Sequence, residues 1–379
     1  MHLFIFLCLL LTAIYAMLMV LYRVGWQLQK EFPLSSSISS TTISIIIPAR
    51  NEAANIERCI RAILAQHYPA ALYEILVIDD HSDDDTYNLV NSFSLPNVRC
   101  IRLAEYVDEH ENITAYKKKA LTVGINNSSG ELIITTDADC IALPDWLAAM
   151  AAIYDAEAPA MIIAPVDYTN NNSIVQLFQS VDFMSMQGIT AATNRLGMGG
   201  MSNGANLAFS RTAFIAVNGY KGIDHIASGD DYLLLMKIKK MFPDKIAYLK
   251  CAKAIVNTTP QPDWKSLLQQ RIRWASKAGK YDDRKMTITL LLVYLFNIGL
   301  VALFIAAFFN ALLFTYIGIM LLVKVLFELF FAWPVAGFFN KRPQLIYLVL
   351  LQPLHILYIV LAGFLGFSGK YQWKGRTIK

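Results

Sequence analysis

The sequence has few charged residues, and it lacks the motifs of several common classes of enzyme and cofactor site. Asp, Glu, Lys and Arg make up 16% of its 379 residues, against about 25% in an average soluble protein. No Gly-x-Gly-x-x-Gly follows the first predicted strand and no Gly-Lys-Ser/Thr P-loop occurs, which disfavours a dinucleotide-binding oxidoreductase and a P-loop enzyme. The five cysteines show no Cys-x-x-Cys spacing, which argues against a disulfide framework and a zinc site.

The segments with few charged residues lie toward the two ends of the chain. Residues 3–22 carry no charge and are about as many as a helix needs to cross a bilayer, and almost everything from Thr287 onward is apolar. The first run has no basic residues before it and continues past Ala16, which favours an uncleaved anchor over a cleaved signal peptide. Because Arg23 and Lys30 follow it directly, the positive-inside rule predicts a plasma (inner) membrane protein with its globular part in the cytoplasm.

Composition and patterning together predict six successive segments. These are a transmembrane anchor (1–24), a polar linker (25–42), a globular domain (43–263), an amphipathic interface helix (264–286), a C-terminal region of two to three transmembrane spans (287–367) and a basic tail (368–379).

The globular stretch alternates short β-branched runs with helical patterns. Strands are expected at 43–48, 74–79, 98–102 and 132–136, and helices at 51–66, 86–93 and 118–126. Such alternation predicts an α/β domain with a mainly parallel sheet. Ligands of these sheets bind at the carboxyl ends of the strands, where 48–52, 79–80 and 137–139 fall.

Carboxylates gather at these strand ends. Asp137 and Asp139, one residue apart, can hold a hard divalent cation on oxygen ligands, and the cation can in turn hold a diphosphate. Asp80 is interpreted as a nucleotide contact because it follows its strand directly, whereas helix capping and turn formation are favoured for 83–85. Asp230 and Asp231 precede a predicted helix at 232–241; one can cap it, but two adjacent acids exceed what a cap requires.

The motif Gln270-x-x-Arg273-Trp274 lies in an expected amphipathic helix, 264–280, whose basic residues include Arg271. A purely interfacial anchor would explain Trp264 and the lysines, but not the three motif residues together. Arg can clamp a diphosphate, and Trp can offer a face to an acceptor.

Six motifs in order resemble the motif series of family 2 inverting glycosyltransferases with a GT-A (Rossmann-like) fold. They are Ile46–Glu52, Val77–Ser82, Lys117–Leu121, Thr136–Asp139, Gly229–Asp231 and Gln270–Trp274, and the resemblance covers about residues 42–280. Two positions depart from the family pattern: His81 stands where glycine is commoner, and Asp230 replaces the usual glutamate.

The resemblance implies a role for each candidate residue. Donor binding would involve Pro48, Ala49, Glu52, Asp80, Lys117 and Asp137. Asp139, together with Asp137, would bind Mg²⁺ or Mn²⁺. Asp231, with Asp230 beside it, would be catalytic as the general base, and the acceptor and diphosphate would be bound by Gln270, Arg273 and Trp274. The expected activity is transfer of a sugar from a nucleotide-sugar donor, most simply a UDP-sugar, to a lipid acceptor in the membrane, with no nucleic-acid partner. A processive polysaccharide synthase and a non-catalytic scaffold that binds nucleotide-sugars or lipid stay open as alternatives.

Several further segments allow two interpretations. The apolar run 173–190 fits core packing or a lipid-facing surface, and the glycine-rich run 196–206 fits close approach to a sugar or a flexible lid. Spans are expected near 287–309, 311–334 and 344–367, with Lys324 and Glu328 paired and facing the bundle. Three full spans would leave the basic C-terminus outside, unless the last segment is re-entrant at Gln352. The ending 373–376 resembles that of ceramide- and hopanoid-type glycosyltransferases.

Overall fold

A computed structural model describes residues 2–34, 39–107, 113–169, 173–276, 283–366, 371–373 and 376–378. It divides into two compact units, which we call the sheet unit (Lys30–Thr169 and Met201–Thr259) and the helical unit (Met1–Gln29, Asn170–Gly200 and Pro260–Lys379). Helix α6 (Ile174–Leu196) belongs to the helical unit, although its sequence lies inside the expected 43–263 domain.

The sheet unit is built on a seven-stranded sheet in the order β3-β2-β1-β4-β8-β6-β9. Its strands are β1 (Ile43–Ala49), β2 (Tyr73–Asp79), β3 (Val98–Arg102), β4 (Leu132–Thr135), β6 (Met161–Ile163), β8 (Leu207–Ser210) and β9 (Ile246–Tyr248). Strands β1 to β4 run parallel, and β8 runs antiparallel to both β4 and β6. The β-branched runs of β1 and β2 are fully buried, as expected for central parallel strands covered on both faces. The predicted mainly parallel α/β fold is confirmed.

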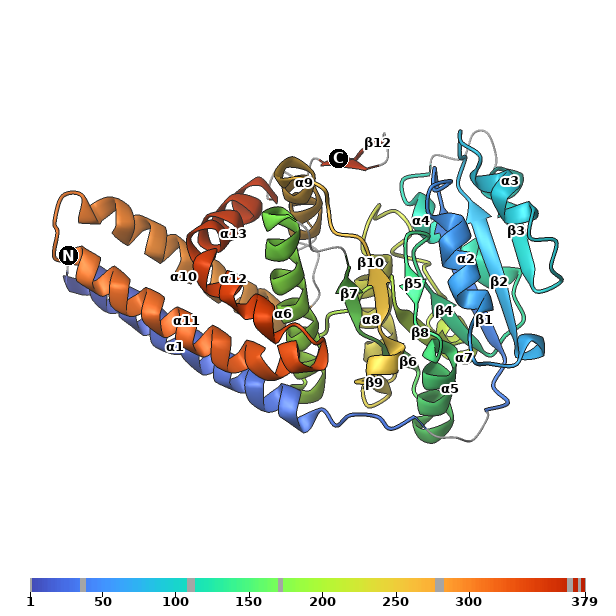
Figure 1. The fold of residues 1–379 in the computed structure, drawn as a ribbon, viewed down its shortest axis with the longest axis horizontal. Coiled ribbons are helices and arrows are strands. Elements are labelled where there is room, and N and C mark those ends of the chain that lie inside the picture. Colours follow the sequence, from blue (N-terminus) through green and yellow to red (C-terminus); the bar gives the residue numbers. More distant parts are fainter. Residues whose placement is uncertain are drawn as a thin grey trace. The chain divides into compact units, whose positions relative to one another are not determined.

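Helices and a second, small sheet complete this unit (Figure 1). The helices are α2 (Ile56–Leu64), α3 (Thr86–Asn91), α4 (Tyr116–Asn126), α5 (Trp146–Glu157), α7 (Arg211–Ala216) and α8 (Asp230–Met241). The small sheet has the order β5 (Ile141–Ala142), β10 (Val256–Thr258), β7 (Val166–Tyr168). Helix α4 packs closely on the large sheet, because a Cβ at Gly124 would lie 2.5 Å from Ile46 Cγ2.

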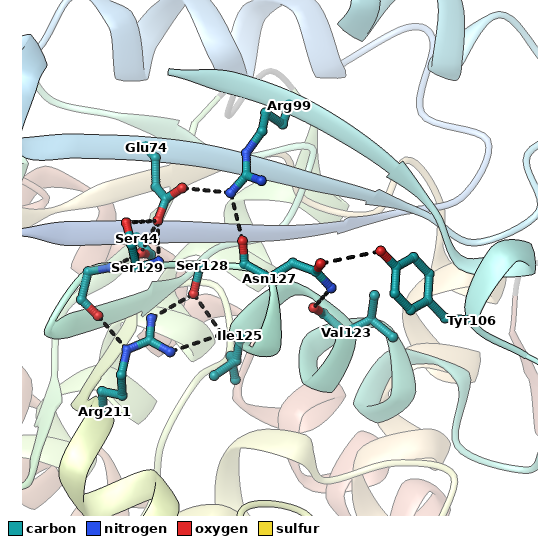
Figure 2. A network of polar contacts seen from close by, with 11 residues as sticks. Ser44, Glu74, Arg99, Tyr106, Val123, Ile125, Asn127, Ser128, Ser129 and Arg211 are labelled. Carbon is teal, nitrogen blue, oxygen red and sulfur yellow. Dashed lines mark hydrogen bonds and ion pairs between the residues drawn. The ribbon is translucent and has the colours of Figure 1, made fainter. Parts of the chain in front are cut away.

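A polar network ties together the amino-terminal ends of the central strands, opposite the edge where ligands are expected (Figure 2). Glu74 Oε1 accepts hydrogen bonds from Ser44 Oγ at 2.8 Å and from the Ser129 amide at 2.6 Å, and Arg99 Nη2 contacts Glu74 Oε2 at 2.8 Å. Burial alone would raise the pKa of Glu74, but these hydrogen bonds outweigh it and lower the pKa. Arg211 donates to the Gly130 carbonyl at 2.7 Å, so the network also fixes the turn before β4.

The helical unit contains long apolar helices and one bent pair (Figure 1). Its helices are α1 (His2–Leu28), α6, α9 (Trp264–Ala275), α10 (Arg284–Ala307), α11 (Leu313–Phe338), α12 (Leu345–Leu350) and α13 (Gln352–Gly366), and a hairpin, β11 (Tyr371–Trp373) and β12 (Arg376–Ile378), follows. In the described part of the chain three helices, α1, α10 and α11, are long and apolar enough to cross a membrane. A fourth span results if the segments 342–350 and 352–366, which meet at 72°, count as one.

The interior of the helical unit contains both apolar and charged side chains. Phe178, Phe183 and Met184 of α6 are buried, which supports core packing for the run 173–190. Lys324 and Glu328 of α11 form the predicted ion pair, and both are buried. Gln352, at the break between α12 and α13, bonds to both of them, and Tyr15 of α1 donates to Glu328. The pair therefore faces the bundle, as predicted.

Candidate active site

The candidate residues of the sheet unit meet at the point where the strand order reverses. The chain runs outward from β1 to β3 and then returns to the other side of β1 with β4. The connections that follow β1 and β4 therefore lead in opposite directions from their carboxyl ends. Crevices at such reversal points are where open α/β sheets bind ligands. Pro48 and Ala49 end β1, Asp80 directly follows β2, and Asp137 follows β4 by two residues.

Asp80 is held firmly beside the end of β1. The Asp80 amide donates to the Ala49 carbonyl at 2.8 Å, and Arg50 Nη1 donates to the Asp80 carbonyl at 2.9 Å. The buried carboxylate lies 2.9 Å from His81 Nδ1. His81 adopts φ +55°, the left-handed conformation that glycine favours. The departure at His81 therefore keeps the glycine-type turn, at a cost of about 1–2 kcal/mol.

The turn after β1 is fastened to the start of α3. The Glu52 amide donates to Thr86 Oγ1 at 2.8 Å, and Asn55 Nδ2 donates to Glu52 Oε2 at 2.9 Å. Asp84 accepts from the amides of Ala53 at 3.0 Å and Thr86 at 3.1 Å. Asp84 thus serves the turn, in agreement with the capping and turn interpretation of 83–85.

Three aspartates and one lysine form what we call the acid cluster: Asp137, Asp230, Asp231 and Lys117. Lys117 Nζ lies 2.8 Å from Asp137 Oδ1 and 3.3 Å from Asp230 Oδ2. Burial lowers the pKa of Lys117, but the charges of the aspartates, Asp137 first, outweigh it and raise the pKa. A Cβ at Gly204 would lie 3.1 Å from Asp230 Oδ2 and 3.4 Å from Lys117 Nζ. The glycine-rich run therefore passes its backbone close to the cluster.

The segment before α8 is held by a residue that sequence reasoning missed. Lys118 is only 1% exposed. Its Nζ donates to the carbonyls of Ile226 and Ser228, the second at 2.9 Å. Gly229, at φ +78°, takes the N-cap position of α8. The expectation that one of the two aspartates caps this helix is therefore wrong; both lie in its first turn, where the helix dipole favours negative charge.

The site offers oxygen ligands of the kind that Mg²⁺ and Mn²⁺ prefer. Asp139 Oδ2 accepts from Thr258 Oγ1 at 3.3 Å, which directs the carboxylate. Burial and the nearby acids raise the pKa of the Cys140 thiol. Within the described residues no group of three or more His, Cys, Asp or Glu side chains forms a metal cage. Two carboxylates, Asp137 and Asp139, fit instead a cation whose remaining ligands are water and substrate oxygens.

In the helical unit, helix α9 contains the second set of candidates. The guanidinium of Arg271 lies 4.2 Å from the ring centroid of Trp274, and the Phe183 ring lies 6.2 Å from the same indole. Arg271, 2% exposed, pairs with Asp182 of α6 at 2.8 Å. Burial raises the pKa of Asp182, but the charges of Arg271 and His355 outweigh it, so the net shift is downward. The buried Gln270 Oε1 has no hydrogen-bond partner among the described residues.

Helix α9 differs from the expected surface helix in one respect. Arg271 was expected among its basic surface residues, yet it is buried against α6 because Asp182 neutralises it there. Trp264, 43% exposed, is available to a membrane interface. Lys277 and Lys280 lie outside the described residues. Asp182 and Arg271 carry no sequence signal as partners, since ion pairs between helices depend on tertiary packing.

Comparison with known proteins provides family matches that cover most of the chain. The model described as "Glycosyl transferase family 2" matches residues 44–201, and that described as "Glycosyl transferase family group 2" matches residues 132–364. Glycosyltransferase AglE of Haloferax volcanii is 31% identical over 147 residues, 38% of this chain and 46% of that protein. Beta-monoglucosyldiacylglycerol synthase of Trichormus variabilis is 27% identical over 124 residues, 30% of this chain and 24% of that protein. The chain thus spans less than half the length of these two relatives.

A solved mannosyltransferase structure resembles nearly the whole chain. The mannosyltransferase PcManGT from Pyrobaculum calidifontis, solved in complex with GDP-Man and Mn²⁺, superposes with a TM-score of 0.61 at 18% identity. The alignment covers 92% of this chain and 99% of that one. At this level of identity the similarity shows the fold.

Proposed function

Because the chain belongs to glycosyl transferase family 2 and has the GT-A fold, we propose that it transfers a sugar, with inversion, from a nucleoside-diphosphate donor to a lipid acceptor. The observation that carries the proposal is the acid cluster beside the reversal point of the sheet. In this proposal Asp137 of the cluster supplies a metal ligand and Asp231 supplies the base, at the edge of the sheet where ligands of such folds bind.

We assign the nucleoside to the ends of β1 and β2. Pro48 and Ala49 would line its pocket, and the carboxylates of Glu52 and Asp80 can accept from base N–H groups and ribose hydroxyls. The fixed position of Asp80 against Ala49 supports this assignment, since a preorganised acceptor loses little entropy on binding. A UDP-sugar is the donor we expect, and GDP-sugars are the first alternative to test.

The transfer itself needs one displacement at the anomeric carbon. Asp231 accepts the proton of the acceptor hydroxyl while the hydroxyl oxygen bonds to the anomeric carbon. The bond from that carbon to the diphosphate breaks, and its electron pair leaves with the diphosphate. Asp231 suits this role better than Asp230, whose Oδ2 lies 3.3 Å from the Lys117 ammonium. Asp137 and Asp139 would hold Mg²⁺ or Mn²⁺, which supplies Lewis-acid stabilisation of the leaving group. Lys117 adds a second positive charge beside the diphosphate.

The acceptor assignment rests on the helical unit. Its apolar helices fit a chain that meets its acceptor in a membrane, and the similarity to a diacylglycerol-lipid synthase points the same way. By the positive-inside rule, the sheet unit would lie on the cytoplasmic side of the plasma membrane. We assign the diphosphate to Arg273 and the acceptor platform to Trp274, with Gln270 beside them. A processive synthase would need more spans to form a channel than the three or four in the described residues. A non-catalytic scaffold would not need Asp137, Asp139 and Asp231.

Two reactions measured on the same purified protein test this proposal: sugar transfer to membrane lipid and slow hydrolysis of the donor by water. Trp274→Ala should impair transfer much more than hydrolysis, because water needs no platform. Arg273→Ala should depress both, because both reactions need a stabilised leaving group. Trp264→Ala, which removes an exposed indole from the same helix, is the matched control and should alter neither reaction per folded molecule. Equal loss of both reactions in Trp274→Ala would exclude the platform role.

A further inference from the structure

Lys117 occupies a position between the two halves of the acid cluster. Its ammonium is 2.8 Å from Asp137, a proposed metal ligand, and 3.3 Å from Asp230, the neighbour of the proposed base. The three side chains are 22%, 39% and 13% exposed, respectively, so solvent screens the contact with Asp137 only in part. A cation that coordinates Asp137 must therefore displace this ammonium or share the carboxylate with it.

The helix that carries Lys117 is held by packing and hydrogen bonds, so the response is expected in the side chain. Helix α4 packs against β1 through Gly124, where a Cβ would clash with Ile46. The next residue, Lys118, is buried and anchored to the segment before α8. Gly204 closes one side of the ammonium, because a Cβ there would already be 3.4 Å from Nζ. The long lysine chain can still move its charge by a few ångströms toward another anion beside the cluster.

From this geometry we infer that Lys117 acts as a gate for the metal: it holds Asp137 until the donor's diphosphate draws the ammonium away. The inference rests on the proposed function and deepens it. The diphosphate offers the ammonium more negative charge than one carboxylate does, and the freed Asp137 oxygen then becomes available to the cation beside Asp139. The cation and the nucleoside diphosphate should consequently bind with positive coupling, and the coupling must be reciprocal.

The test measures Mn²⁺ binding directly, from the electron paramagnetic resonance signal of the free ion, using the full-length protein in detergent. In wild type, UDP should lower the dissociation constant of Mn²⁺ by about tenfold or more, which is within the range typical of coupled sites. GDP takes the place of UDP if UDP does not bind. Lys117→Met keeps the length of the side chain but removes its charge. It should bind Mn²⁺ more tightly than wild type when no nucleotide is present, by about tenfold, and it should bind the nucleotide more weakly. Its coupling between the two ligands should shrink.

Lys119→Met is the matched control, since it removes the same charge from the same helix about 200° around the axis. It should leave both affinities and their coupling unchanged. The gate is refuted if Lys117→Met, without nucleotide, binds Mn²⁺ no more tightly than wild type. Circular dichroism must show that this variant is folded. Failure of the proposed function looks different: wild type would then bind neither UDP nor GDP, with or without Mn²⁺.

Discussion

Replacing Asp231 with asparagine separates the proposed base from the residues that bind the donor. The substitution preserves the shape of the side chain, and its amide oxygen can still accept from the Tyr232 amide, as Asp231 Oδ1 does at 2.7 Å. The start of α8 should therefore be retained. Loss of a general base costs about 10²–10⁴ in rate, which is about 2.7–5.4 kcal/mol of transition-state stabilisation. Transfer should fall by this amount, with donor affinity near that of wild type.

Asp230→Asn is the matched comparison, because it removes an adjacent carboxylate from the same turn. It weakens the contact with Lys117 but leaves that ammonium paired with Asp137 at 2.8 Å. Its loss of transfer should be smaller, and part of it should appear as altered donor affinity. Initial rates across donor concentrations distinguish the two effects. A greater fall in maximal rate for Asp230→Asn than for Asp231→Asn would show that the base has been assigned to the wrong carboxylate.

Further substitutions probe the buried polar contacts of the two units. Glu74→Gln should lower the unfolding free energy of the sheet unit by about 1.5–3 kcal/mol, because Ser129 and Arg99 bond to different oxygens of the carboxylate and an amide keeps only one of these acceptors. Thermal unfolding at pH 7 measures this loss. Since folding lowers the pKa of Glu74, its contribution is complete above about pH 4.5 and is lost as the pH falls further, so the difference between variant and wild type should narrow in acid. Glu328→Leu should destabilise the detergent-solubilised protein by about 3–5 kcal/mol by leaving a buried lysine unpaired, and Lys324→Leu in addition should restore most of the loss. Asp182→Asn frees Arg271 from its partner and should reduce lipid transfer more than donor hydrolysis, with unchanged donor affinity.

The sheet and the position of the candidate site could be predicted because both follow from local patterns. Short β-branched runs separated by helical periods leave little choice but a parallel sheet, and acids that follow such strands must converge at one edge. The boundaries were less accurate where turn geometry decides them. Helix α2 begins at Ile56 and not at Asn51, which adopts φ +52° in the turn after β1.

The features that could not be predicted depend on partners distant in sequence. Lys118 and Arg271 are charged residues that local patterning places at the surface, yet both are buried, because carbonyl groups near Ser228 and the carboxylate of Asp182 compensate them. The N-cap of α8 could not be predicted because aspartates are good caps by residue type, and two of them stand beside Gly229. Gly229 occupies that position instead, and its left-handed backbone directs the chain into the helix.

The most direct test of the proposed activity is to combine the purified protein, in nanodiscs made with natural membrane lipids, with a panel of UDP- and GDP-sugars. Released nucleoside diphosphate and new glycolipids are then quantified together by mass spectrometry. We predict that one donor yields nucleoside diphosphate and glycolipid in equal amounts when Mn²⁺ or Mg²⁺ is present, and that EDTA or Asp139→Asn abolishes both products. Full glycolipid formation in excess EDTA would contradict the metal-dependent mechanism, and the absence of any glycosylated lipid across the panel, with donor hydrolysis intact, would contradict the lipid acceptor.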